Sequence, residues 1–385
     1  MRPHSPSQTA APSTPRTRPI PVCEPDIGEL EVALVTQCLK SGWVSSIGPW
    51  VSRFEEAYAA HCGCQFAVST CNGTAALHLA LLALGIGPGD EVLVPAFTFV
   101  SSANAVVYTG AVPVLMDVDP TTWNLDVEDA RRKLTPRTRA IMAVHVFGNP
   151  ADMAAVAALA AEYGLAVVED AAEAHGARWQ GQPVGSLGDV GCFSFFGNKL
   201  ITTGEGGMLV TNRPELADAA RKWGNLSRPQ GHHYFHDAVG FNYRTASLQA
   251  ALGLAQLQRI EELLAKKLRN AERYLRLLVA IPGLRPQRVL PGATSSWWVV
   301  SIVVEDTFGA TREDLSQHLH RRGIDTRPFF VPLHRLPPYA SSPPCPVAEE
   351  ISQRGLLLPS GPRLEPEAIE EIVEAIGCLA QGGGR

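Results

Sequence analysis

The sequence lacks the features that would mark a membrane protein, a nucleic-acid-binding protein or a disulfide scaffold. It contains no uninterrupted apolar run of the roughly 18 residues that a membrane-spanning helix needs. A formal net charge of -5 gives no basic field for nucleic acid or for an anionic membrane surface. No two pairs among its eight cysteines have the spacing of a zinc site. We therefore expect a cytoplasmic protein with reduced thiols and no bound metal.

The first twenty residues lack acidic side chains and also lack the apolar core of a signal peptide. Proline, serine and threonine dominate this segment, which predicts a disordered tail over residues 1–20. The whole chain of 385 residues is long enough for one large or two medium domains. Its hydrophobic fraction of 45% is ordinary for a globular protein.

Strand-like and helical patterns alternate through the first part of the sequence. Many of the expected strands are separated by segments with helical spacing of apolar residues, such as 74–84 and 151–163. This alternation predicts a large α/β domain over residues 21–255, with a mostly parallel seven-stranded sheet covered on both faces. The expected strands are 65–70, 91–96, 112–118, 140–147, 166–170, 190–196 and 207–211.

The last third of the sequence has a different rhythm. A long helical pattern over 247–280 is followed by a strand pattern at 296–304 and by shorter helical patterns. The proline-rich stretch 328–346 predicts a loop region. We expect a smaller C-terminal α+β domain over residues 256–385. Ligands of open α/β sheets bind at the carboxyl ends of the strands, so the chemistry should lie there.

The motif Asn72-Gly73-Thr74 lies between an expected strand and an apolar helix. Free backbone N–H groups at a helix start bind phosphate, and Gly73 would let the backbone approach closely. Thr74 adds a hydroxyl. An ordinary helix N-cap explains the same residues, so this motif alone leaves both interpretations open.

Two acids, Glu169 and Asp170, end another apolar strand. A buried carboxylate needs a cationic partner, and a protonated ring nitrogen would supply one. The alternative is a turn acid that caps the following helix.

Lys199 follows the apolar run that contains Ser194. A desolvated lysine loses its charge readily and can bond to an aldehyde, while Ser194 could reach a phosphate on the same molecule. Phe99 follows a third strand and could stack on a flat ring. A solvated lysine and a core phenylalanine are the alternatives. Taken together, these residues call for a flat, phosphorylated aldehyde with a protonatable nitrogen, which describes pyridoxal 5'-phosphate (PLP).

Five ordered segments carry a resemblance to a known family. They are SGWVSSIGPWVSRFEEAYA (41–59), NGTAALHLALLALGIGPGDEVLVPAFTFVSSANAV (72–106), VVEDAAEAHGA (167–177), GDVGCFSFFGNKLITTGEGGML (188–209) and GFNYRTASLQAALGLAQL (240–257). Through them the chain, from about residue 20 to about residue 378, resembles the DegT-type sugar aminotransferases within the fold-type-I PLP enzymes.

The resemblance implies PLP as the cofactor and a homodimer with shared active sites. The matched positions are Lys199 at the cofactor aldehyde, Asp170 at the ring nitrogen, Gly73, Thr74 and Ser194 at the phosphate, Phe99 on the ring face, Glu173 at the phenolic oxygen and Asn242 at the phosphate of the neighbouring subunit. Many family members carry glutamine where this chain has Glu173.

The resemblance also implies glutamate as amino donor and a nucleotide-linked 4-keto-6-deoxy sugar as acceptor. Glu173, GNKLITTGEGG and YFHDAVGFNYR are most similar to members that aminate C4 of GDP-4-keto-6-deoxymannose. Two segments outside the PLP motifs offer an aromatic face, hydroxyls and a cation for such a substrate. The candidate substrate residues are Trp43, Ser45, Ser46, Arg327 and His334.

Several alternatives remain open at the level of the sequence. An aminotransferase for a UDP- or dTDP-linked sugar would use the same chemistry. A PLP-dependent sugar dehydratase of this fold carries histidine where Lys199 stands, and a non-catalytic sensor would not need Lys199 and Asp170 intact. A dinucleotide-binding enzyme is disfavoured, because the glycines of 85–89 follow a helix and precede a strand, the reverse of the fingerprint.

Overall fold

The computed structural model describes residues 19–229 and 231–382 of the chain. Of the tail expected over 1–20, residues 1–18 lie outside these described residues. Ile20 is buried, its N–H donates to the Gly323 carbonyl at 2.8 Å, and its carbonyl accepts from the Asp325 N–H at 2.9 Å. The folded part of the chain therefore includes Ile20.

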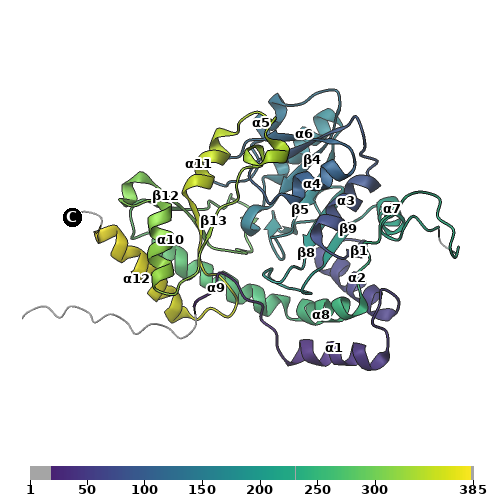
Figure 1. Cartoon of the computed structure of the whole chain (residues 1–385), viewed down its shortest axis with the longest axis horizontal. Coiled ribbons are helices and arrows are strands. Elements are labelled where there is room, and N and C mark those ends of the chain that lie inside the picture. The colour runs from purple at the N-terminus through teal and green to yellow at the C-terminus, as the bar shows by residue number, and fades with distance from the viewer. Residues whose placement is uncertain (1–18, 230, 383–385) are drawn as a thin grey trace, which may run out of the picture.

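A seven-stranded sheet forms the centre of the molecule (Figure 1). In spatial order its strands are β1 (Phe66–Thr70), β9 (Gly207–Thr211), β8 (Val190–Ser194), β5 (Ala166–Asp170), β4 (Thr138–Val144), β2 (Glu91–Pro95) and β3 (Val112–Met116). β9 pairs antiparallel with β1 and β8, and the other four pairings of the sheet are parallel. The structure thus confirms the predicted mostly parallel seven-stranded sheet.

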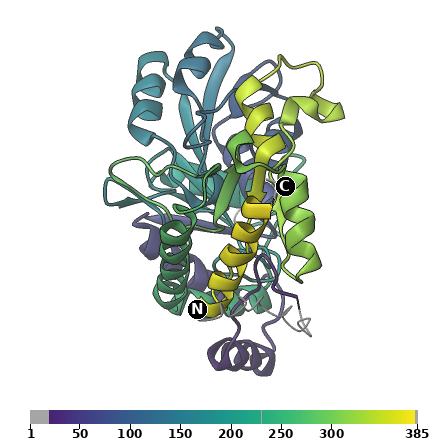
Figure 2. The same cartoon turned by 90° about the vertical axis from the view of Figure 1, so that its left-hand side faces the viewer.

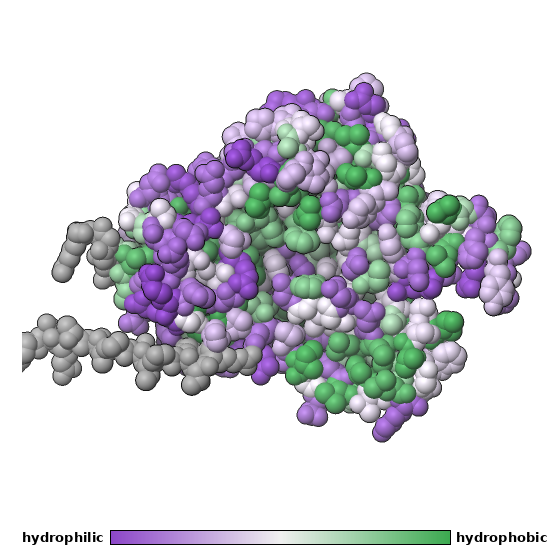
Figure 3. All heavy atoms as spheres, in the orientation of Figure 1, coloured by the Kyte–Doolittle hydropathy of each residue, from purple (hydrophilic) through white to green (hydrophobic). Residues whose placement is uncertain are grey.

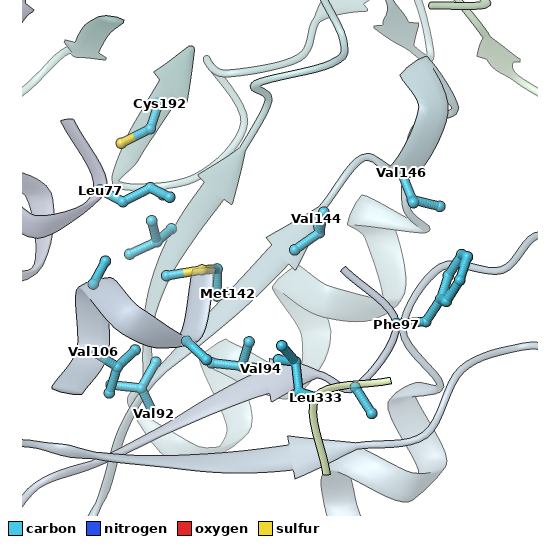
Figure 4. Packing of buried hydrophobic residues seen from close by; sticks show 14 of the residues in the cluster. Leu77, Val92, Val94, Phe97, Val106, Met142, Val144, Val146, Cys192 and Leu333 are labelled. Carbon is cyan, nitrogen blue, oxygen red and sulfur yellow. The ribbon is translucent and has the colours of Figure 1, made fainter. Parts of the chain in front are cut away.

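Helices cover both faces of this sheet. On one face lie α3 (Gly73–Ala83), α4 (Ser101–Tyr108) and α7 (Pro214–Gly224), and on the other α2 (Pro49–Cys62), α5 (Val127–Arg132), α6 (Met153–Tyr163) and α8 (Ser247–Gln258). Strand pleating sends alternate residues to opposite faces, so Val92 and Val94 pack on the first group and Leu93 on the second. Figure 4 shows the first face, where both valines lie close to Val106 of α4.

The smaller C-terminal unit is built on a second, antiparallel sheet. Its strands, in spatial order, are β10 (Leu284–Pro286), β12 (Ser301–Val304), β14 (Gly355–Leu357) and β13 (Arg327–Pro328). Its helices are α9 (Ile260–Leu278), α10 (Arg312–Arg321), α11 (Pro346–Arg354) and α12 (Pro366–Gly382). Figure 2 shows α12 running alongside α10.

A third, small sheet joins the two units through β11 (Ala293–Thr294), β6 (Arg178–Trp179) and β7 (Gln182–Pro183). The remaining elements are helix α1 (Glu29–Ser41) and the short 3-10 helices η1 (Val146–Gly148), η2 (Asp306–Phe308), η3 (Leu333–Arg335) and η4 (Pro337–Tyr339). No helix in the ranges 19–229 and 231–382 is both long enough and apolar enough to cross a membrane.

Three of the expected strands end earlier than predicted, at Met116, Val144 and Ser194, and two larger differences lie in the last third of the chain. The helix expected over 247–280 is two helices that meet at Arg259, where the backbone leaves helical geometry with φ -105° and ψ 4°. The break allows α8 to pack on α1 and α2 while α9 packs on α12. The strand expected from residue 296 begins only at Ser301, because Trp297 adopts a positive φ of 48°.

Candidate active site

A cavity of about 550 Å³ lies at the carboxyl ends of the parallel strands. Loops that follow β1, β2, β4, β5 and β8 line it, and residues of the smaller unit, including Trp298 and Phe330, close it. Of the residues expected from the sequence, the lining contains Gly73, Thr74, Phe99, Asp170, Glu173, Ser194, Lys199 and Arg327. Positions that are far apart in the chain are thus brought into one cavity.

Lys199 lies in the turn after β8, with its side chain only 11% exposed. Its Nζ lies 3.4 Å from Glu173 Oε1 and 4.0 Å from the centroid of the Trp298 ring. These two contacts hold the end of the Lys199 side chain inside the cavity.

Glu173 lies on the loop after β5 and is fixed from two sides. The Phe147 N–H donates to Glu173 Oε2 at 2.9 Å, and Lys199 Nζ donates to Oε1 at 3.4 Å. Burial raises the pKa of the Glu173 carboxyl, and the positive charge of Lys199 opposes this. The protonated form of Glu173 is therefore more accessible than that of an exposed glutamate.

Asp170 ends β5 at the floor of the cavity and is buried. The Ser102 hydroxyl donates to Asp170 Oδ2 at 2.7 Å, and the Ala172 N–H donates to Oδ1 at 3.2 Å. Burial raises the pKa of Asp170, and the hydrogen bond from Ser102 opposes the rise. The carboxylate is oriented and desolvated, as a site for a cationic ligand atom requires.

The start of α3 provides the place for an anion. The Asn72 side chain accepts from the Ala75 N–H at 2.8 Å, while the N–H groups of Gly73 and Thr74 have no acceptor among the described residues. A Cβ on Gly73 would lie 2.9 Å from the Cβ of Ser194, so glycine is needed for this close approach. The hydroxyls of Thr74 and Ser194 line the same end of the cavity.

The two phenylalanines after β2 have opposite environments. Phe97 is buried in the core, whereas Phe99 lines the cavity with 57% of its surface exposed. The Phe99 ring contacts Phe330 edge-on, with 6.0 Å between centroids. An aromatic face is therefore available to a flat ligand at Phe99.

Other residues named from the sequence lie outside the lining of this cavity. Trp43 is half exposed beyond the end of α1, and its neighbour Ser45 accepts through its carbonyl from the Ser247 N–H at 2.7 Å. Ser46 Oγ accepts from Arg244 Nε at 3.2 Å.

Two more such residues lie farther along the chain. Asn242 is exposed, and its backbone forms an isolated bridge with Asn225. His334 is buried, with its Nε2 2.7 Å from Glu349 Oε1. Neither residue lines the cavity of its own chain.

His175 lies beneath the site rather than in it. Its Nε2 is 2.7 Å from the Ser194 carbonyl oxygen, and its Nδ1 is 2.7 Å from the Tyr58 hydroxyl. Burial lowers the pKa of His175 to about 3, so the ring is neutral. A carbonyl can only accept, so Nε2 carries the hydrogen and Nδ1 accepts from Tyr58. This ring holds the backbone at Ser194, next to the anion site.

Sequence reasoning missed three contributors to the site. Ser102 orients Asp170, the backbone N–H of Phe147 binds Glu173, and Trp298 contacts Lys199. Ser102 lies in the first turn of the helix that follows β2, so its place at the carboxyl end of a strand could have marked it as a candidate site residue. Nothing in the local pattern indicates that Trp298 returns to the cavity from the smaller unit.

The residues present fit PLP. Asp170 needs a cation, the N–H groups at the start of α3 need acceptors, Phe99 needs a flat partner, and Lys199 is desolvated beside them. A ligand that is at once an aldehyde, a phosphate and a basic heterocycle uses all of these positions. The fold and the site together therefore define a fold-type-I PLP enzyme.

Comparison with known proteins gives the family. The chain belongs to the DegT/DnrJ/EryC1/StrS aminotransferase family, whose model matches residues 25–377. GDP-perosamine synthase of Escherichia coli O157:H7 is 42% identical over 358 residues, which are 93% of this chain and 97% of that protein. GDP-perosamine synthase of Caulobacter vibrioides is 42% identical over 361 residues, with the same two shares.

A solved structure agrees with this assignment. DesV of S. venezuelae superposes with a TM-score of 0.88 at 36% identity, covering 96% of this chain and 100% of that one. The chain is therefore a PLP-dependent sugar aminotransferase. The expectations of the sequence for fold class, family, enzyme type and cofactor are confirmed.

Proposed function

We propose that this enzyme transfers an amino group from glutamate to C4 of GDP-4-keto-6-deoxymannose and so forms GDP-perosamine. The observation that carries the proposal is the similarity to GDP-perosamine synthases along nearly the whole chain. Glu173, which distinguishes this chain from relatives with glutamine there, lies in the cavity beside Lys199.

Lys199 is the proposed catalytic residue. When bound, PLP supplies the aldehyde that carries the amino group between the two substrates and a ring that draws electrons from the reacting carbon. Lys199 removes the proton from the α-carbon of glutamate and later returns a proton to the sugar carbon. Its Nζ is held by Glu173 and Trp298, two contacts that leave it facing the cavity.

The other cavity residues hold the cofactor. Asp170 would keep a proton on the ring nitrogen of bound PLP, and Ser102 fixes the carboxylate for that task. The N–H groups of Gly73 and Thr74, with the hydroxyls of Thr74 and Ser194, bind the phosphate. Phe99 covers one face of the ring.

Glu173 would meet the phenolic oxygen of bound PLP. Its raised pKa favours a carboxyl that donates a hydrogen bond there, as the glutamine of other family members can.

Arg327 is the proposed anchor for the substrate diphosphate. It lines the cavity from β13, and its side chain is 60% exposed, so the guanidinium is accessible. In the structure Arg327 Nη1 donates to Asp325 Oδ1 at 2.5 Å and to the Thr326 carbonyl at 3.1 Å, both just before the strand. A guanidinium with free N–H groups can bind two phosphate oxygens at once.

The active unit is proposed to be a homodimer. Asn242 lies outside the cavity of its own chain and is exposed, as a residue that serves the neighbouring site must be. Trp43, Ser45 and Ser46 also lie outside the cavity of their own chain, and in the dimer they would contact substrate bound in the neighbouring subunit.

An apolar surface supports this assembly. Figure 3 shows a hydrophobic patch over α1, and the exposed apolar side chains there and just beyond are Val32, Leu39, Trp43, Val44 and Ile47. A second copy of the chain is the occupant that would also place Asn242 at a phosphate.

All eight cysteines are unpaired in the described part of the chain, which favours the reducing cytoplasm as its compartment.

A product assay tests the proposed substrate. Purified enzyme, PLP and glutamate are incubated with GDP-, UDP- and dTDP-linked 4-keto-6-deoxy sugars, and products are identified by mass spectrometry and NMR. The expected result is a 4-amino sugar that retains GDP. Amination of UDP- or dTDP-linked sugars alone would overturn the perosamine assignment, and loss of the C3 hydroxyl without amination would mean a dehydratase.

A further inference from the structure

A lysine is buried in α9 without an acidic partner. The Lys267 side chain is 1% exposed, and no carboxylate lies within ion-pair distance of its Nζ in the described ranges 19–229 and 231–382. Its nearest polar contacts are the Trp298 carbonyl oxygen at 2.5 Å and Cys23 Sγ at 3.9 Å. Burial lowers the pKa of Lys267, so holding this side chain inside the protein has a cost. A buried lysine without an acidic partner is rare in proteins, so its short hydrogen bond to the Trp298 carbonyl points to a specific task.

Trp298, the residue that Lys267 contacts, also contacts the catalytic lysine, Lys199. Trp298 accepts from Lys267 through its backbone carbonyl and donates from its indole Nε1 to the Asn198 carbonyl at 2.8 Å. The face of the same indole lies 4.0 Å from Lys199 Nζ. Trp298 is therefore in contact with Lys267, with Lys199 and with the residue that precedes Lys199.

The backbone at Trp298 needs such an anchor. Its neighbour Trp297 has a φ of 48°, a left-handed conformation that is unfavourable for a bulky residue. A Cβ on Gly148 would lie 2.8 Å from the Trp298 N atom, so glycine is required for this segment to approach η1. The Trp297 N–H donates to Ser295 Oγ at 3.1 Å. Hydrogen bonds on both sides of Trp297 thus hold a strained peptide against the cavity.

We propose that Lys267 is a positioning residue for Lys199, acting through the carbonyl and the ring of Trp298. The proposal rests on the proposed role of Lys199 as the catalytic amine. Lys267 holds the Trp298 backbone beside the strained residue Trp297. The indole of Trp298 then binds the Asn198 carbonyl through Nε1 and contacts Lys199 Nζ with its face. Without the hydrogen bond from Lys267 the Trp298 backbone is held less firmly, so the indole and its contact with Lys199 Nζ can shift.

Lys267→Met tests the proposal, because methionine fills a similar volume but cannot donate. Turnover in the glutamate half-reaction should fall on the order of 10-fold, since small displacements of a reacting group are costly. The KM for glutamate should change less than about twofold, because Lys267 lies outside the cavity. Lys266→Met is the matched control, since Lys266 is the residue just before Lys267 and its Nζ pairs with Asp26 and Glu262 instead of contacting Trp298.

A measurement without the bound cofactor separates positioning from general damage. Cofactor-free protein is treated briefly with pyridoxal and borohydride, and the rate of labelling at Lys199 is followed by peptide mass spectrometry. We expect slower labelling of Lys199 in Lys267→Met and unchanged labelling in Lys266→Met. A cooperative melting transition in each apoprotein shows that both variants are folded. Normal labelling and turnover in a folded Lys267→Met protein would overturn the proposal.

Two further variants keep the test decisive if Lys267→Met does not fold. Lys267→Gln retains a neutral donor toward the carbonyl and should recover part of the lost rate, whereas a purely ionic role predicts no recovery. Trp298→Phe removes the indole donor to Asn198 and should also lower kcat; normal kcat in that variant would reject the proposal as well. Labelling of wild type at a lysine other than Lys199 would instead reject the proposed function itself.

Discussion

Glu173 Oε1 lies 3.4 Å from Lys199 Nζ, while Glu173 Oε2 accepts from the Phe147 N–H. Because burial raises the pKa of Glu173, we expect its carboxyl to work as a hydrogen-bonding group rather than as a charge. Glu173→Gln should therefore keep kcat within about threefold of wild type, whereas Glu173→Leu, which leaves the Phe147 N–H unpaired, should lose on the order of 10-fold or more. Stopped-flow absorbance of the glutamate half-reaction measures both. Equal losses in the two variants would show that the negative charge is needed.

Asp170→Asn should inactivate the enzyme while keeping its shape. The amide cannot hold a proton on the ring nitrogen, and loss of one such electrostatic partner commonly costs on the order of 100-fold or more in rate. Ser102→Ala, which removes only the donor that orients Asp170, should cost less. Activity of Asp170→Asn within a factor of two of wild type would mean that Asp170 is only a turn residue.

The same substitution should stabilise the protein when the cofactor is removed. The folded pKa of Asp170 is raised above 3.8, so its contribution to stability is full below that value and is lost as pH rises through the folded pKa. Near pH 8 the apoprotein therefore buries an unfavourable carboxylate, which asparagine eliminates. Calorimetry of apoproteins should give a higher melting temperature for Asp170→Asn than for wild type, and a lower one would contradict this reading.

His175 should make the fold sensitive to mild acid. Its pKa falls from 6.5 to about 3 on folding, so the unfolded chain binds the extra proton and stability is lost as pH drops from about 6.5 toward 3. A pKa displacement of this size is worth roughly 5 kcal/mol at most.

The variant His175→Gln should flatten the decline of melting temperature across this pH window, whatever its effect near pH 8. His78, whose pKa burial lowers to about 4, adds a similar decline and remains in the variant as an internal reference. An unchanged slope in His175→Gln would show that His175 does not titrate on unfolding.

Much of the site could be predicted because its parts stand at the ends of apolar strands. The strands expected at 166–170 and 207–211 have those bounds in the structure, and Asp170 is the last residue of the first. Where strand ends are known, the residues just beyond them meet at one edge of the sheet, which is why Lys199 could be placed beside Asp170.

The rest of the site depends on contacts that local patterns do not encode. Trp298 stands in an apolar run that is typical of a buried strand, but Trp297 turns the backbone to a positive φ, and the segment lies against Gly148 and the cavity. Lys267 reads as part of an ordinary amphipathic helix until its contact with the Trp298 carbonyl is seen. Such tertiary relationships override the period of the sequence.

Arg327→Ala should separate the two substrates. Loss of a charge-assisted hydrogen bond to the diphosphate should raise the KM for the keto-sugar nucleotide about 10- to 100-fold and leave the glutamate half-reaction near wild type. Arg335→Ala is the control, because Arg335 is exposed outside the cavity. Equal damage to both half-reactions by Arg327→Ala would contradict a role in diphosphate binding.

Mixing two inactive variants tests the shared active site. Lys199→Ala removes the catalytic amine, and Asn242→Asp places a negative charge where the partner's phosphate would bind, so each homodimer should be inactive. In a mixed dimer, one site combines an intact Lys199 with an intact Asn242, and the other carries both defects. Random exchange at equal amounts should therefore restore roughly a quarter of wild-type activity.

Two observations make the mixing result decisive. Chains with different affinity tags show directly that subunits have exchanged, and a mixture of Lys199→Ala with a Lys199→Ala/Asn242→Asp chain provides the control that cannot regain a lysine. Proven exchange without recovered activity would confine each active site to one chain. The proposed role of Asn242 at the phosphate of the neighbouring subunit would then be rejected.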